Sequence, residues 1–210
     1  MKYVYLHGFA SGPGSGKAQF FRRKFREQGV DLIVPLLVPS EQFEQITLTG
    51  QLAVMEQMIG SEPAVLLGSS MGGYLASLYA ASHVNVSKLV LMAPAFYFPH
   101  RWSEELGAAR TAEWKRRGRM EVFHYGEGRL RQVGWNLVED AQQYPPAPHF
   151  TQPALVFHGN YDSVVRPEFS IEFAKNRANI DLRLVDSDHQ LTNVTSLMWD
   201  ETKPFLFETA

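Results

Sequence analysis

The chain has 210 residues, of which 45% are hydrophobic and 20% charged, and its formal net charge at pH 7 is −2. These values predict one globular domain, and the small charge offers no electrostatic attraction for nucleic acid or an anionic membrane. The sequence has no cysteine, which excludes disulfides, thiolate metal sites and a cysteine nucleophile. No signal peptide and no apolar run of about 18 residues is visible, so we expect a cytoplasmic protein without a membrane span.

Short apolar runs alternate along the chain with amphipathic segments of helical length. The runs that predict strands are Lys2–Leu6, Leu32–Pro35, Ala64–Leu67, Lys88–Met92, Ala154–Phe157 and Leu182–Val185. The segments that predict helices are Lys17–Gln28, Thr49–Ile59, Met71–Ser82, Glu168–Asn176 and Thr195–Glu208, the last broken or shifted near Pro204. Because strands covered by helices on both faces are apolar throughout, the pattern predicts an α/β fold with a mostly parallel sheet of about six strands.

One segment interrupts this alternation. Between Pro94 and Pro153 the chain is far longer than a single crossover helix requires, and it carries three of the four tryptophans. We predict that residues 95–152 form a helical lid, inserted into a single domain of residues 1–210, because long loops of this kind often serve binding. The alternative is a pair of packing helices with no role in binding.

A G-x-S-x-G pattern, Gly68-Ser-Ser-Met-Gly72, lies between a predicted strand and a predicted helix. In that context it predicts a nucleophile elbow, a sharp and strained turn that holds Ser70 at the edge of a sheet. Gly68 and Gly72 are expected on either side of it because side chains would collide in so tight a turn. The alternative is an ordinary glycine-rich turn in which the serine caps the helix.

An acid and a histidine follow the later strands in the order that such a serine requires. Asp162 follows one predicted strand and His189 follows the next, and parallel strands place both loops at the same edge of the sheet as Ser70. We predict Ser70 as the nucleophile, His189 as general base and then acid, and Asp162 as the group that orients the imidazole. Asp186 and Asp188 are alternatives to Asp162.

The glycine-rich segment Ser11–Lys17 raises the alternative of a nucleotide-binding P-loop. That motif needs a leading glycine and a Ser or Thr after the lysine, whereas here Ser11 leads and Ala18 follows, so nucleotide binding is not expected. We expect this segment to be a flexible rim whose Lys17 opens the first helix or faces solvent.

His7-Gly8-Phe9, directly after the first predicted strand, fits the loop that offers a backbone N–H to a developing oxyanion. We predict the N–H groups of Phe9 and Met71 as the oxyanion hole. His158 is expected to pack behind the site, and no histidine pair has the spacing of a zinc site, so no metal is expected.

Four motifs in this order resemble the small α/β-hydrolase esterases of the YqiA-like type. They are Leu6-His-Gly-Phe9 with Lys17-Ala18, Gly68-Ser-Ser-Met-Gly-Gly73, His158-Gly-x-x-Asp162 and Asp188-His189. The resemblance covers the chain from the first strand to the last helix. It implies a compact α/β-hydrolase fold, carboxylesterase activity without a cofactor, and triad roles for Ser70, Asp162 and His189.

The leading hypothesis is therefore hydrolysis of a small-molecule carboxylic ester through an acyl-enzyme. A thioesterase is an alternative, because the basic run Lys115–Arg119 could attract an acidic carrier. A hydrolase or lyase acting on carbon–carbon bonds would keep the same triad, and a non-catalytic binding module would need none of it. The natural ester, its chain length and the oligomeric state are not determined by the sequence.

Overall fold

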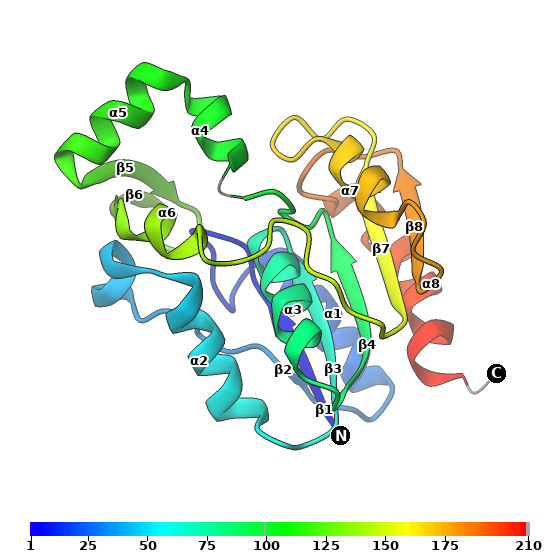
Figure 1. The fold of residues 1–210 in the computed structure, drawn as a ribbon. Helices are drawn as coiled ribbons and strands as arrows, with labels where there is room; N and C mark the ends of the chain where they lie inside the picture. The colour runs from blue at the N-terminus through cyan, green and yellow to red at the C-terminus, as the bar shows by residue number, and fades with distance from the viewer. Residues whose placement is uncertain (99, 209–210) are drawn as a thin grey trace.

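The computed structural model describes residues 1–98 and 100–208, so residue 99 of the predicted insertion and residues 209–210 lie outside it. The main sheet of the described chain has six strands, all parallel, in the order β2-β1-β3-β4-β7-β8 (Figure 1). The strands are β1 (Lys2–Leu6), β2 (Leu32–Ile33), β3 (Ala64–Ser69), β4 (Val86–Met92), β7 (Ala154–Gly159) and β8 (Ile180–Val185). The predicted fold class is confirmed.

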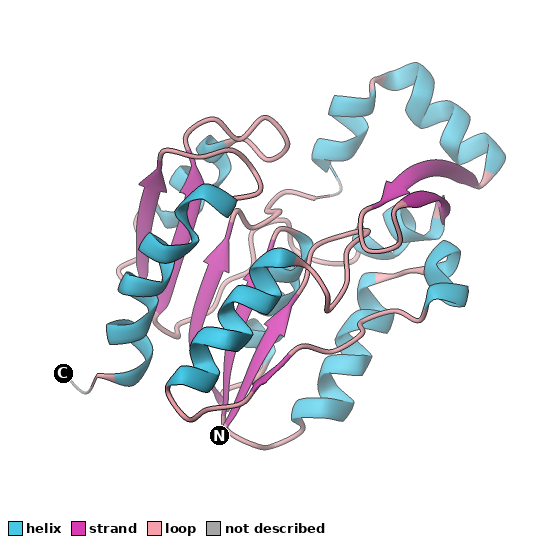
Figure 2. Ribbon diagram, turned by 180° about the vertical axis from the view of Figure 1, so that it is seen from behind, coloured by secondary structure: helices cyan, strands magenta, loops and turns pink. Residues whose placement is uncertain are grey.

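Helices cover both faces of this sheet. They are α1 (Gly16–Glu27), α2 (Leu48–Ile59), α3 (Met71–Ser82), α7 (Pro167–Ala174) and α8 (Thr195–Phe207), with short 3₁₀ helices η1 (Ser40–Gln45) and η2 (Thr192–Val194). Helices α1 and α8 lie in front of the sheet in Figure 2, and α2 and α3 lie on the opposite face. Successive residues of β3 point to opposite faces: Leu66 packs in one buried cluster, and Val65 and Leu67 pack in the other. Both faces are buried, which explains the continuous apolar runs.

The predicted insertion is helical only in part. It contains α4 (His100–Leu106), α5 (Ala108–Arg117), the antiparallel hairpin of β5 (Arg119–His124) and β6 (Arg129–Gly134), and α6 (Asn136–Ala141). Gly118 ends α5 in a left-handed conformation, and Gly128, with φ of 65°, lies in the turn between the strands. Such conformations favour glycine, and they let the chain reverse into a hairpin where we predicted helix.

The insertion is packed onto the rest of the chain. Trp114, Val133 and Leu137 are buried in the same hydrophobic cluster as Leu66 of the central strand β3. Figure 1 shows the inserted elements beyond the carboxyl ends of the strands, on the side of α2.

The prediction of a break near Pro204 is wrong, because α8 continues through that residue to Phe207. Proline removes one helical hydrogen bond. The last turn is held instead by packing, since Phe207 lies against Phe25 of α1 and Trp199 of α8, with ring centroids 5.4 and 6.3 Å away.

Candidate active site

Ser70 occupies the tight turn between β3 and α3. Its backbone has φ 54° and ψ −119°, a strained conformation for a residue with a side chain. A Cβ on Gly68 would lie 2.4 Å from the carbonyl oxygen of Gly72, across the turn itself. A Cβ on Gly72 would lie 2.1 Å from the carbonyl oxygen of Leu6, at the end of β1. Both positions therefore require glycine, and the turn lies directly against the neighbouring strand.

The structure brings Ser70, Asp162 and His189 together, although they are far apart in the sequence. Nε2 of His189 lies 3.1 Å from Oγ of Ser70, and its Nδ1 lies 2.7 Å from Oδ2 of Asp162. Because a carboxylate only accepts hydrogen bonds, Nδ1 carries the proton, and Nε2 is left to accept the Ser70 hydroxyl. The geometry allows a proton to pass from Ser70 to His189 when Ser70 attacks an electrophile.

Four donors hold the buried carboxylate of Asp162. Its Oδ1 accepts the backbone N–H groups of Val164 and Val165 at 2.9 and 2.7 Å, and its Oδ2 accepts His189 and, at 3.1 Å, Nε2 of His158. Burial by itself would raise the pKa of Asp162, but the hydrogen bonds from His158 and His189 outweigh it and hold the pKa well below its usual range. Asp162 therefore stays ionised across the neutral range.

His158 positions that carboxylate from behind. Its Nε2 lies 2.8 Å from the carbonyl oxygen of Val165, which only accepts, so Nε2 is the donor toward Asp162 as well. Its Nδ1 lies 2.7 Å from the hydroxyl of Ser170 in α7, and both side chains are buried. The structure places His158 where the sequence analysis expected a packed side chain, and it adds the hydrogen bond to Asp162.

The two alternative acids make their hydrogen bonds elsewhere. Oδ1 of Asp188 accepts the backbone N–H of Gln190 at 2.9 Å. Asp186 hydrogen bonds to Tyr161, and this bond is the main cause that raises the pKa of the tyrosine. Asp162 is therefore the acid in hydrogen-bond contact with the His189 ring.

The predicted oxyanion pair lies beside Ser70. A Cβ on Gly8 would be 3.4 Å from Cβ of Ser70, so the loop after β1 passes close to the serine. Phe9 and Met71 line the same pocket as Ser70. Within the described chain their backbone N–H groups donate no hydrogen bond, whereas the N–H of Ser70 donates to the carbonyl of Met92 at 2.9 Å. Both N–H groups are thus free of an acceptor in residues 1–98 and 100–208, as oxyanion donors have to be.

A cavity of about 840 Å³ opens at this edge of the sheet. Ser70 and His189 line it, together with an aromatic group in which Phe9 contacts both Phe43 and Trp102, with ring centroids 5.6 and 5.1 Å apart. The volume suits a small-molecule ligand with an apolar part.

The glycine-rich segment of residues 11–17 also lines this cavity, and its Lys17 opens α1, the first of the two placements expected for it. Lys17 is the second residue of α1 and is only partly exposed. Sequence reasoning missed its place in the cavity because a lysine at the start of a helix normally reaches into water.

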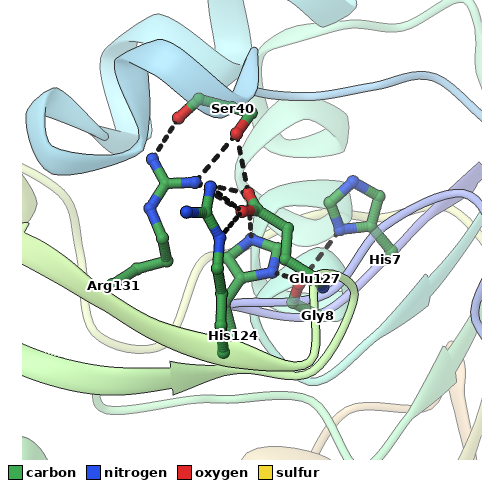
Figure 3. Close-up of polar contacts among 7 residues, drawn as sticks. His7, Gly8, Ser40, His124, Glu127 and Arg131 are labelled. Carbon is green, nitrogen blue, oxygen red and sulfur yellow. Dashed lines mark hydrogen bonds and ion pairs between the residues drawn. The ribbon is translucent and has the colours of Figure 1, made fainter.

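The tip of the β5–β6 hairpin lines one side of the cavity, and Figure 3 shows its polar contacts with Ser40. Glu127 accepts hydrogen bonds from Arg129, Arg131 and Ser40 at 2.5 to 2.8 Å, and Arg131 also donates to the hydroxyl and the carbonyl of Ser40 in η1. Burial raises the pKa of Glu127, but these bonds outweigh it and lower the pKa to about 2. Charged hydrogen bonds therefore fasten the hairpin to the core.

One histidine of this hairpin, His124, and one of the loop after β1, His7, lie near each other where the two segments meet. His124 accepts the backbone N–H of Glu127 at 3.2 Å, and Nδ1 of His7 lies 3.0 Å from the carbonyl of Gly8 (Figure 3). Burial is the main cause that lowers the pKa of both imidazoles.

The alternation of polar and apolar residues in 119–124 and 129–134, with glycines between, is the sequence signal that could have revealed the β5–β6 hairpin.

Neither a metal-binding cluster nor a membrane-spanning helix is found in residues 1–98 and 100–208. No group of three or more His, Cys, Asp or Glu side chains there is arranged to hold a metal ion. None of the helices in the same ranges is both long enough and apolar enough to cross a bilayer.

Sequence comparison identifies a family over nearly the whole chain. Residues 2–205 match the model of the uncharacterised protein family UPF0227. No curated protein matches the sequence.

Solved structures resemble the chain over nearly its whole length. Alpha/beta hydrolase domain-containing protein 10 from mouse has a TM-score of 0.80 at 18% identity, covering 98% of this chain and 89% of its own. A putative hydrolase from Agrobacterium vitis S4 has a TM-score of 0.80 at 24% identity, covering 96% and 86%. Est1E from Butyrivibrio proteoclasticus with ferulic acid bound has a TM-score of 0.75 at 21% identity, covering 98% and 88%. At these identities the likeness shows the fold, which is that of the α/β-hydrolases.

Proposed function

The chain belongs to the YqiA-like family UPF0227 and has the α/β-hydrolase fold, and on this basis we propose that it is a serine hydrolase that cleaves carboxylic esters of small molecules. The observation that carries the proposal is the hydrogen-bonded series from Asp162 through His189 to Ser70, with contacts of 2.7 and 3.1 Å. A binding module would need none of these three residues in contact, and three separate loops have to fold to one edge of the sheet to align them.

In the first half of the reaction, Oγ of Ser70 attacks the ester carbonyl carbon while Nε2 of His189 takes its proton. The negative charge that develops on the carbonyl oxygen is stabilised by the backbone N–H groups of Phe9 and Met71. When the C–O bond breaks, His189 returns the proton to the departing alcohol, and the acyl group stays on Ser70.

Water then repeats these steps. His189 removes a proton from the water, which attacks the acyl carbon, and the carboxylic acid leaves as Ser70 regains its proton. Asp162 keeps the imidazole in the required tautomer and offsets its charge while it is protonated, and His158 holds Asp162 in place. The reaction needs no cofactor.

We include the inserted segment in this proposal, as a lid within a single domain. Trp102 and the hairpin tip at His124–Glu127 line the cavity, so the segment forms part of the wall against which a substrate packs. The aromatic group of Phe9, Phe43 and Trp102 offers an apolar surface for the acyl part of an ester.

A fluorophosphonate probe tests this proposal directly, because it reacts with a serine that an adjacent base activates. We expect stoichiometric labelling of the peptide that contains Ser70, and no labelling of Ser70→Ala. The unlabelled protein should hydrolyse nitrophenyl esters, with a burst of nitrophenol equal to the enzyme concentration if deacylation is slow. Hydrolysis of acyl-thioesters, followed with a thiol reagent that detects the released thiol, tests the thioesterase alternative. Absence of both labelling and turnover over a series of acyl lengths would overturn the proposal.

A further inference from the structure

Lys17 places a positive charge at the wall of the candidate active site. Among the described residues that line the cavity it is the only Lys or Arg. Two acidic residues also line it, and each has hydrogen-bond donors of its own: Glu127 is paired with Arg129 and Arg131, and Asp188 accepts the backbone N–H of Gln190. The ammonium of Lys17 forms no hydrogen bond and no ion pair with any residue in 1–98 or 100–208.

The surroundings of this ammonium are poorly hydrated. Burial lowers the pKa of Lys17 to about 8, against a smaller opposing effect from the carboxylates of Asp162 and Asp188. A cation that has lost water without gaining a partner is destabilised, and an anion brought into the cavity would restore the lost interaction. The mechanism described above makes no use of Lys17.

The position of Lys17 indicates which part of an ester substrate it would contact, the alcohol part or the acyl part. The two carboxylates that attract it are the partner of His189 and the residue before His189, and Asp188 and His189 line the cavity with it, so the lysine is within electrostatic range of the histidine side of the site. The aromatic group instead surrounds Phe9, which belongs to the oxyanion loop. Because the imidazole has to reach the oxygen of the departing alcohol, the alcohol part of an ester lies on the side of His189.

Building on the proposed ester hydrolysis, we propose that Lys17 forms a subsite for a carboxylate carried by the alcohol part of the substrate. An ammonium donates short, charge-assisted hydrogen bonds to carboxylate oxygens, and it gains most where water is partly excluded. The acyl part then packs on the aromatic group. The natural substrate is thus an ester of a hydroxy acid, and hydrolysis releases a hydroxy-carboxylate and a second acid.

Matched ester pairs test this subsite. In the first pair, 4-acetoxybenzoate and its methyl ester, the carboxylate or its neutral replacement is on the leaving group. In the second pair, mono-4-nitrophenyl glutarate and its methyl ester, it is on the acyl group. The measured quantity is the ratio of kcat/KM for the anionic ester to that for the neutral one, and comparing this ratio between variants cancels the intrinsic reactivities of the esters.

We expect Lys17→Met to lower this ratio about tenfold for the first pair and Lys17→Arg to preserve most of it. Lys24→Met, which removes a lysine of the same helix that pairs with Glu27 and does not line the cavity, should change it less than about twofold. Equal losses on both esters of the first pair would mean that Lys17 only supports the structure. A fall in the ratio confined to the second pair would place the anion on the acyl group. Either result would overturn the proposal.

A binding measurement separates failure of the subsite from failure of the proposed function. Calorimetric titration of 4-hydroxybenzoate into Ser70→Ala, and into the same variant with Lys17→Met, requires no turnover. We expect about tenfold weaker binding in the double variant and no such difference for methyl 4-hydroxybenzoate. Equal binding of 4-hydroxybenzoate to both variants would overturn the subsite, whether or not any ester is hydrolysed.

Discussion

Replacing Asp162 by Asn tests the hydrogen bonding of the proposed triad, because the carboxylate accepts from four donors and an amide cannot. If the amide nitrogen takes the place of Oδ2, it faces Nδ1 of His189 and Nε2 of His158, both of which donate. If it takes the place of Oδ1 instead, it faces the backbone N–H groups of Val164 and Val165. In either orientation, the amide N–H₂ of the asparagine therefore faces two hydrogen-bond donors where a carboxylate oxygen had accepted from both.

The two orientations have different consequences. With nitrogen toward His189, the imidazole has to move its proton to Nε2 to accept from the amide, and it can then no longer take the proton of Ser70. With nitrogen toward the backbone, two N–H groups lose their acceptor, at a cost of about 1–3 kcal/mol for the buried N–H of Val165 and less for that of the exposed Val164. The orientation with the amide nitrogen toward His189 costs less stability, because Nε2 of His158 keeps its bond to the carbonyl of Val165.

We therefore expect Asp162→Asn to lower kcat for a nitrophenyl ester by about 10³- to 10⁴-fold. The unfolding free energy should fall by about 1–3 kcal/mol, which corresponds to roughly 3–10 °C in Tm for a domain of this size. Kinetics with an active-site titration and a thermal melt measure the two effects. Asp186→Asn is the matched control and should keep activity within about twofold. Full activity in Asp162→Asn, or a large loss in Asp186→Asn, would refute the assignment of the acid.

Three further predictions concern single positions. Ser70→Ala should lose turnover on the order of 10⁴-fold or more, as nitrophenyl ester kinetics would measure, and retain a cooperative melt. Gly72→Ala should cost roughly 3 kcal/mol or more in urea unfolding, because its Cβ would meet Leu6 at 2.1 Å, whereas Gly14→Ala, with open space around its Cβ, should stay within about 0.5 kcal/mol. Lys17→Met should raise stability at pH 7 by up to about 3 kcal/mol, since the pKa of Lys17 is about 8 when folded and 10.5 otherwise. The folded protein loses this proton first as pH rises, so the advantage of the variant should shrink by about 1 kcal/mol between pH 8 and 9. An advantage that is the same at pH 7 and 9 would contradict the burial of a charged Lys17.

The order of the elements could be predicted from the sequence because each strand and helix leaves its own local pattern. Six apolar runs with helical segments between them correspond to the six parallel strands of the sheet. The inserted hairpin was missed because residues 119–124 and 129–134 carry charges at many positions, and their strand conformation depends on pairing with each other and packing on η1. Pro204 was misjudged for a similar reason, since aromatic packing holds the last turn of α8 in spite of a lost hydrogen bond.

Motif and chain order alone indicated Ser70, Asp162 and His189, because the carboxyl ends of parallel strands have to meet at one edge of the sheet. Which carboxylate contacts the imidazole was decided only by the tertiary structure, since Asp186 and Asp188 are closer to His189 in sequence yet bond to other groups. The same holds for the hydrogen bond from His158 and for the place of Lys17 in the cavity. The local sequence shows whether a side chain is polar and at which end of a strand or helix it lies. The exposure of that side chain to water, and its contacts with residues far away in the sequence, are fixed only when the loops of several strands close around one cavity.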